Sequence, residues 1–147
     1  MRIEHHVDIA APPSLVWELT VDVDALPDHT PTMTDVARLD QAPLAVGSRV
    51  RIKQPAQRAK VWTVTELDEN RRFSWATRST GTVMTASHDM VETSTGTTNT
   101  LTVDMDGPIG AVIGALVRRQ VKKAIATENE AFKAVAEQRH GSSTVVE

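Results

Sequence analysis

Residues 108–138, PIGAVIGALVRRQVKKAIATENEAFKAVAEQ, decide the fold of this chain. Their apolar residues recur at spacings of three and four, which is the spacing of one face of an α-helix. They are Val112, Ile113, Leu116, Val117, Val121, Ala124, Ile125, Phe132 and Val135. A helix of about 30 residues is ~45 Å long and cannot bury such a stripe by itself. The pattern therefore predicts one long helix, beginning at Pro108, that lies along a sheet.

The residues before this helix have the two-residue period of β-strands. Residues 2–10 alternate apolar and polar side chains, as a half-buried strand does. Six further strands are expected between turns that contain Gly, Pro, Asn or Asp, at 33–40, 48–54, 59–67, 72–79, 82–92 and 97–105. Pro12, Pro13 and Asp24 favour two short helices after the first strand. The order predicts an α+β fold, with a seven-stranded curved antiparallel sheet around one long C-terminal helix.

The composition limits the kinds of function. The 147 residues suit a single domain at 1–138, and residues 139–147 show no periodicity, which predicts a flexible tail. A net charge of −3 argues against nucleic acid as a partner. The chain has no cysteine and no tyrosine, so thiol and phenol chemistry are excluded. The first ten residues lack the apolar core of a signal peptide, and the longest apolar run, 109–117, is too short to cross a bilayer. We therefore expect a cytoplasmic protein without stable membrane insertion.

Four segments carry a resemblance to a known superfamily. They are IEHHVDIAAPPSLVWELTVDVDALPDH at 3–29, PLAVGSRVRIKQP at 43–55, WTVTELDENRRFSWATRS at 62–79 and GPIGAVIGALVRRQVKKAIATENEAFKAVAE at 107–137. Together they resemble the START-like, or SRPBCC, superfamily of lipid-transfer domains, polyketide cyclase/dehydrase-like proteins and plant pathogenesis-related allergens. The resemblance implies the helix-grip fold, in which the sheet and the long helix enclose a cavity for a hydrophobic molecule.

The residues expected to line this cavity come from the inward faces of the strands and of the long helix. They are His5, Gln54, Trp62, Trp75, Met84, His88, Met90, Met105, Leu116 and Gln120. Five of the ten are Trp or Met side chains, and polar His and Gln groups stand among them, as in ligand pockets with a few positioned polar groups. The same apolar residues also suit an ordinary packed core. Gln120 would bind either a ligand or strand backbone, and Gln54, near a strand end, either a ligand or solvent.

His88 is the candidate for acid–base chemistry. It lies between Ala86 and Met90 on the inward face of a strand, where an imidazole can move a proton or orient a ligand. The alternative is a neutral histidine held within the core. Asp22, Asp24 and Asp28 lack the spacing of a calcium loop, so we predict no metal and no cofactor. The basic residues Arg118, Arg119, Lys122 and Lys123 suit a solvated helix face, or else an anionic membrane or partner surface.

Three functions follow from these features. The first is a carrier or sensor that encloses a lipid- or polyketide-like molecule, with entry gated by residues 22–31 and the start of the long helix. The second is an enzyme of the polyketide cyclase or dehydratase type, with His88 as acid or base. The third is a protein-interaction module whose groove receives a partner segment.

Overall fold

The computed structural model describes residues 1–145, with side chains through residue 142. Within these residues, seven strands form one antiparallel sheet in the order β1-β7-β6-β5-β4-β3-β2. The strands are β1 (Arg2–Ile9), β2 (Asp35–Arg38), β3 (Arg49–Lys53), β4 (Lys60–Asp68), β5 (Arg72–Ser79), β6 (Thr82–Thr93) and β7 (Gly96–Asp106). The helical elements are α1 (Pro13–Val21), the 3-10 turn η1 (Val23–Ala25), α2 (Leu26–His29) and α3 (Gly110–Val145).

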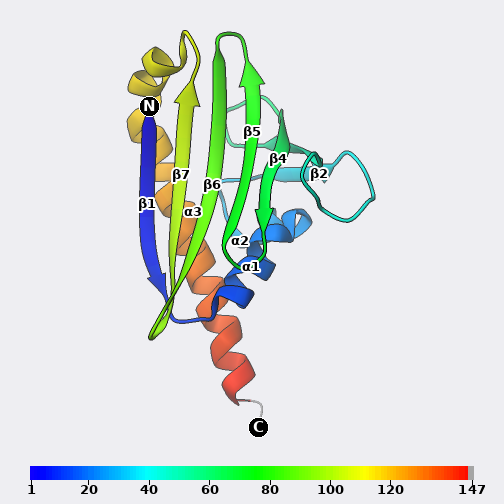
Figure 1. The fold of residues 1–147 in the computed structure, drawn as a ribbon, viewed down its shortest axis with the longest axis vertical. Coiled ribbons are helices and arrows are strands. Elements are labelled where there is room, and N and C mark those ends of the chain that lie inside the picture. Colours follow the sequence, from blue (N-terminus) through cyan, green and yellow to red (C-terminus); the bar gives the residue numbers. More distant parts are fainter. Residues whose placement is uncertain (146–147) are drawn as a thin grey trace.

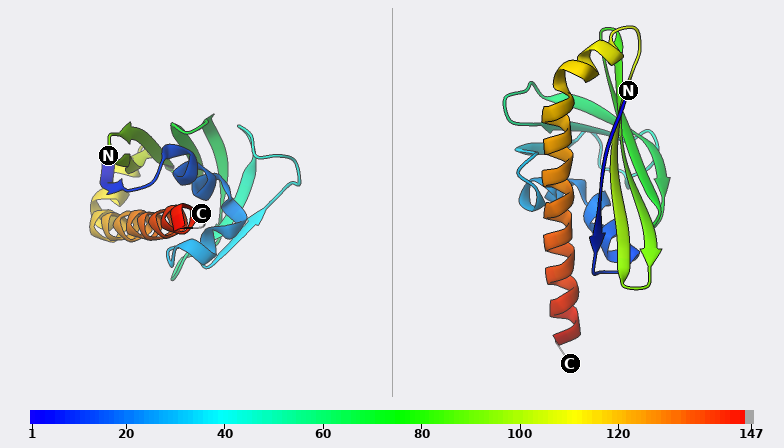
Figure 2. Two further views of the ribbon diagram at one scale, coloured as in Figure 1. Left: turned by 90° about the horizontal axis from the view of Figure 1, so that it is seen from below. Right: turned by 90° about the vertical axis from the view of Figure 1, so that its left-hand side faces the viewer.

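The helix α3 lies behind the sheet, along its concave side. Figure 1 shows β1, β7, β6, β5 and β4 side by side in front of α3, with α1 and α2 near the lower end. In Figure 2 the sheet curves around α3, whose last turns extend beyond the lower end of the sheet. This is the helix-grip fold expected from the strand and helix patterns. Among the described residues, no helix combines the length and the apolar character needed to span a bilayer.

Two boundaries of α3 differ from the predicted ones. Gly107 has a φ of +100°, and a Cβ there would lie 2.6 Å from the carbonyl oxygen of Gly81. The chain turns at this point, so α3 begins at Gly110 and not at Pro108. At the other end, residues 139–145 continue α3, so the tail predicted there is helical. Residues 146–147 of that predicted tail lie outside the described residues.

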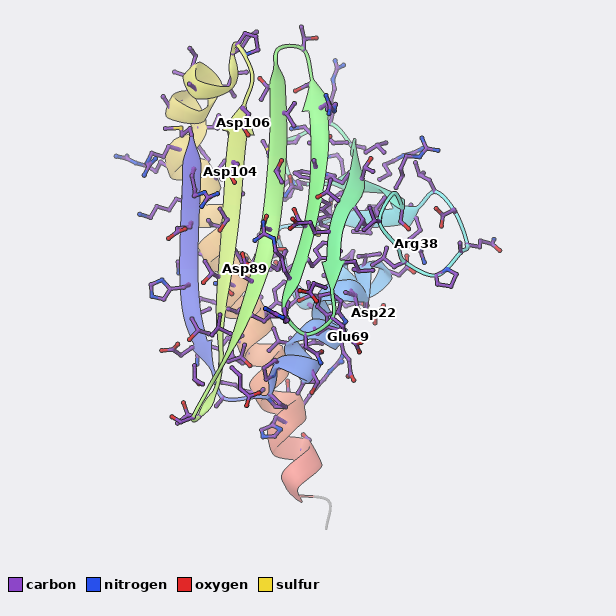
Figure 3. All side chains as sticks on the ribbon, viewed as in Figure 1. Asp22, Arg38, Glu69, Asp89, Asp104 and Asp106 are labelled. Carbon is purple, nitrogen blue, oxygen red and sulfur yellow. The ribbon has the colours of Figure 1, made fainter. Side chains whose placement is uncertain are left out.

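The outer face of the sheet is polar and ion-paired. Arg72 donates from one guanidinium nitrogen to both carboxylate oxygens of Asp89 at 2.7 Å, and from another to the carboxylate of Glu66. Arg2 pairs with Asp104 at 3.0 Å. Figure 3 shows Asp89 and Asp104 on the face of the sheet turned away from α3. Apolar ligands would therefore gain burial only on the opposite, helix-facing side.

The apolar core between the sheet and α3 is divided into two clusters. The larger cluster joins α1, β3, β4 and β5 to the second half of α3 through Phe132. The smaller cluster joins β1 and β7 to α3 through Ile125. Met84 and Ala86 of β6 contact both clusters from the space between them. Incomplete filling of that space leaves a cavity.

Candidate ligand-binding cavity

A cavity of about 400 Å³ lies between the sheet and α3. Its apolar lining comes from β3 to β7 and from the first half of α3. These residues are Ile52, Trp62, Trp75, Met84, Ala86, Leu101, Val103, Ile113, Val117, Val121, Ala124 and Ile125. The volume falls in the usual range for small-molecule sites, and so does the mostly apolar lining with few polar groups.

Aromatic rings form one wall of the cavity. The rings of Trp62 and Trp75 lie with centroids 5.9 Å apart on neighbouring strands. Phe73 packs edge-on against Trp75 at 4.9 Å and against the ring of His88 at 5.8 Å. His88 in turn packs edge-on against Phe132 of α3 at 5.8 Å. The rings therefore form a continuous row from β4 to α3, which holds the imidazole in a defined orientation, and three of them, Trp62, Trp75 and His88, line the cavity.

His88 is a buried imidazole at the edge of the cavity. Only 5% of its surface is exposed, and its Nδ1 atom has no hydrogen-bond partner among the described residues. Burial in this apolar site lowers the pKa of His88 to about 4. The imidazole is therefore neutral at neutral pH, with one buried nitrogen that has no hydrogen-bond partner among the described residues.

Glu128 is a second titratable group on the same cavity, and the sequence analysis did not include it. Its Oε1 atom is fully buried and has no partner among the described residues. Glu128 keeps some accessible surface, and the residue borders the cavity. Burial raises the pKa of Glu128 to about 7. A signal was present in the sequence, because Glu128 lies three residues after Ile125 and four before Phe132, within the apolar stripe.

Six of the ten predicted site residues line the cavity: Gln54, Trp62, Trp75, Met84, His88 and Gln120. Met90 and Met105 face inward as expected, but each is packed within one of the two core clusters. Leu116 is 74% exposed and lies away from the cavity. The sequence analysis placed Leu116 inward because its spacing fits the apolar stripe of the long helix. In the structure, the side of α3 that carries Leu116 faces outward.

His5 also lies outside the cavity lining, because β1 runs beneath α3. The side-chain amide nitrogen of Asn129 donates to the carbonyl oxygens of His5 at 3.1 Å and of Asn99 at 3.0 Å, and lies 3.1 Å from His5 Nδ1. Asn99 donates back to the Asn129 carbonyl oxygen at 2.9 Å. These bonds fasten α3 to β1 and β7, so the role of His5 here is structural.

The mouth of the cavity is polar. Gln57, from the connection between β3 and β4, and Gln120, from α3, are exposed residues that line it. The opening therefore lies between that connection and α3. Residues 22–31, the predicted gate, contribute no lining side chain, although Thr32 and Met33 directly after them do.

A curved antiparallel sheet that grips one long C-terminal helix over an apolar cavity defines a protein of the START-like, helix-grip class. The chain belongs to the family described as polyketide cyclase / dehydrase and lipid transport, whose model matches residues 1–137. No curated protein sequence matches the chain.

Solved structures with this fold include the Zhui aromatase/cyclase from Streptomyces sp. R1128, at 23% identity and a TM-score of 0.76, over 95% of this chain and 94% of that one. The di-domain ARO/CYC StfQ of the steffimycin biosynthetic pathway aligns at 14% identity and a TM-score of 0.79, over 95% of this chain and 52% of StfQ. A START superfamily protein from Mycobacterium smegmatis aligns at 16% identity and a TM-score of 0.71, over 93% of this chain and 97% of that one. At these identities the likeness concerns the fold.

Proposed function

We propose that the protein is a carrier or sensor that binds a lipid- or polyketide-like molecule in the cavity between the sheet and α3. The observation that carries the proposal is the apolar cavity of about 400 Å³. Burial of ~300 Å² of apolar ligand surface contributes on the order of 7 kcal/mol before the cost of immobilisation. A gain of that size corresponds to a dissociation constant of about 10 μM before that cost is subtracted, so tighter binding needs hydrogen bonds between ligand and protein as well.

The polar atoms in the cavity narrow the class of ligand. His88 Nδ1 and Glu128 Oε1 are both buried and both lack a partner among the described residues. An unpaired buried polar atom costs about 1–3 kcal/mol, which a bound molecule can recover by a hydrogen bond. A hydroxyl group both donates and accepts, so it suits either tautomer of the imidazole and either state of the carboxyl. We therefore favour a ligand with an apolar body and a hydroxyl or phenol at the end near His88.

An enzyme of the cyclase or dehydratase type is the second candidate, because the cavity lining includes, besides Lys60, two titratable groups of complementary state. His88 is neutral at neutral pH and can accept a proton, and Glu128 with a pKa of about 7 can donate one. In the dehydration of a β-hydroxyketone, His88 would remove the proton α to the carbonyl. Glu128 would protonate the departing hydroxyl, so that a C=C bond forms and water leaves.

Native mass spectrometry of the freshly purified protein, followed by solvent extraction, tests the binding proposal. A matched pair of substitutions on α3 supplies the control, since Ala124 lines the cavity and Ala134 is exposed. We expect a bound apolar mass, or binding of added 2-naphthol by calorimetry, that Ala124→Phe abolishes and Ala134→Phe leaves unchanged. The proposal is contradicted if neither a bound apolar mass nor binding of 2-naphthol is found. It is also contradicted if the two variants bind equally.

The enzyme candidate has its own test. His88→Leu and Glu128→Gln should each abolish dehydration of an aromatic β-hydroxyketone by the protein, while binding of 2-naphthol weakens by about tenfold or less. If the unmodified protein binds 2-naphthol but does not dehydrate such a compound, the carrier or sensor function stands alone.

A further inference from the structure

We infer that the first half of α3 is a docking surface for an anionic lipid bilayer. Three large aliphatic side chains face solvent at its start or directly before it: Ile109, which precedes the helix, is 41% exposed, Val112 is 60% exposed and Leu116 is 74% exposed. Neighbouring exposed aliphatic side chains at one site commonly mark an interaction surface. These three, together with Arg119 and Lys123 further along the same side, are called the α3 docking face below.

The spacing of the four members within the helix places them on one side of it. Val112, Leu116, Arg119 and Lys123 follow one another at intervals of four, three and four, which is the spacing of a single helical face. Ile109 lies directly before the helix, beside Gly81. The aliphatic side chains occupy the first turns and the cations the next two. A helix that lies in a membrane interface has this composition, because its apolar residues enter the acyl boundary while Lys and Arg reach the headgroups.

The charge of this segment is complementary to an anionic surface. Residues 107–127 contain four cations and no acidic residue, although the whole chain has a net charge of −3. None of the ion pairs among the described residues involves Arg118, Arg119, Lys122 or Lys123. Asp104 and Asp106, on the strand before α3, lie on the opposite face of the sheet (Figure 3). The cations are therefore free to meet lipid phosphates and carboxylates.

A second copy of the chain fits this face poorly. Three aliphatic side chains provide much less than the ~800 Å² per partner of a standard interface. A symmetric contact would also bring together the four unpaired cations of each copy, and like charges at close range repel.

The α3 docking face and the cavity lining share the same turns of α3. Ile113, Val117 and Gln120 line the cavity from the same turns of α3 that carry Val112 and Leu116 outward. A docked molecule would therefore hold the cavity mouth close to the lipid. A role for docking in the loading of a ligand rests on the binding function proposed above. Docking of α3 to the lipid bilayer does not rest on it.

Vesicle flotation tests the inference, with vesicles of phosphatidylcholine alone or with about 30 mol % phosphatidylserine. We expect the protein to float only with the anionic vesicles, and to be released when salt rises from about 0.05 M to about 0.5 M. The double substitution Val112→Ser/Leu116→Ser should weaken binding at least about tenfold. Its matched control, Val46→Ser/Val91→Ser, removes two valines of similar exposure, 64% and 62%, and should have no effect.

The cations have a matched control as well. Arg119→Gln/Lys123→Gln should weaken flotation by about twentyfold, and Arg49→Gln/Arg51→Gln, exposed residues of β3, should not. Ala124→Phe, which fills the cavity, should float like the unmodified protein, and the docking variants should keep their cavity ligand in native mass spectrometry. The inference is overturned by absence of flotation, by equal loss in the control variants, by loss in Ala124→Phe, or by a dimer that Val112→Ser/Leu116→Ser dissociates.

Discussion

Glu128 and Asn129 are neighbours on α3, yet one has an unpartnered carboxyl oxygen at the cavity and the other is fully hydrogen-bonded to the sheet. Their side chains leave the helix about 100° apart, which is the angle between consecutive helical residues. One of the two therefore fastens the helix to β1 and β7, and the other borders the space that this attachment leaves open. Attachment of the helix and lining of the cavity thus fall to different residues within one turn.

Removal of the Asn129 side chain should destabilise the fold. Asn129→Leu leaves the carbonyl oxygens of His5 and Asn99 without their donor, and the amide of Asn99 without its acceptor. We expect the free energy of unfolding in urea to fall by about 3 kcal/mol. Glu130→Leu, at the exposed position next to it, is the control and should change it by about 0.5 kcal/mol or less. Equal effects of the two substitutions would show that these hydrogen bonds do not fasten α3.

Glu128 should make the protein less stable as pH rises. Its ordinary pKa of 4.5 applies in the unfolded chain, and burial raises the pKa to about 7 in the fold. Between these values the folded state holds the extra proton, so the free energy of unfolding falls as pH rises from about 4.5 to about 7. Glu128→Gln should remove this loss and stabilise the protein by up to about 3 kcal/mol near pH 8, with no gain near pH 4. Urea unfolding across pH measures the effect, and the exposed Glu130→Gln should not reproduce it.

His88 should have an effect on the pH dependence of stability that is opposite to the effect of Glu128. Its pKa falls from 6.5 in the unfolded chain to about 4 in the fold, so the unfolded state holds the extra proton between these values. The free energy of unfolding therefore falls as pH drops from about 6.5 to about 4. In the unmodified protein this slope and that of Glu128 oppose each other between about pH 4.5 and 6.5. His88→Leu should leave a stability that only falls with rising pH in that interval, and Glu128→Gln one that only rises. The exposed His6→Gln is the control.

The regular elements were predictable because their periods are carried by many residues. The β5 strand has its predicted bounds, β4 and β7 differ from the predicted strands by one residue at each end, and β6 extends one residue beyond its predicted end. Alternation along β6 correctly placed Met84 and His88 on the inward face.

The cavity was less predictable, because lining depends on where the helix crosses the sheet. His5 is on the inward face of its strand, but α3 lies directly over β1 and takes the position that a ligand would need. Leu116 has the spacing of the stripe but lies on the side of the helix that faces outward, whereas Ile113 and Val117 of the same turns line the cavity. Glu128 was missed because a carboxylate among apolar residues is ordinarily placed in solvent. Only the three-dimensional structure distinguishes a charged side chain at the edge of a stripe from one that enters a cavity.

The ion pair on the outer face should contribute little to stability and nothing to binding. Asp89 and Arg72 are partly exposed, so solvent screens their attraction despite the two contacts at 2.7 Å. Asp89→Asn should lower the free energy of unfolding by about 1 kcal/mol or less, and less still in high salt. Binding of 2-naphthol, measured by calorimetry, should be unchanged. A large loss of binding would mean that a substitution on the outer face of the sheet alters the cavity on its inner face.

The two indole rings on the cavity wall should make the intrinsic fluorescence of the protein sensitive to a molecule bound in the cavity. The chain has three tryptophans and no tyrosine, and two of the three, Trp62 and Trp75, border the cavity. Trp17 is packed with α1 in the core, so its emission should stay constant when the cavity fills. If the cavity binds a ligand as proposed, intrinsic fluorescence excited in the near ultraviolet should therefore follow its occupancy without any label. Compounds can be screened by the change in emission wavelength alone.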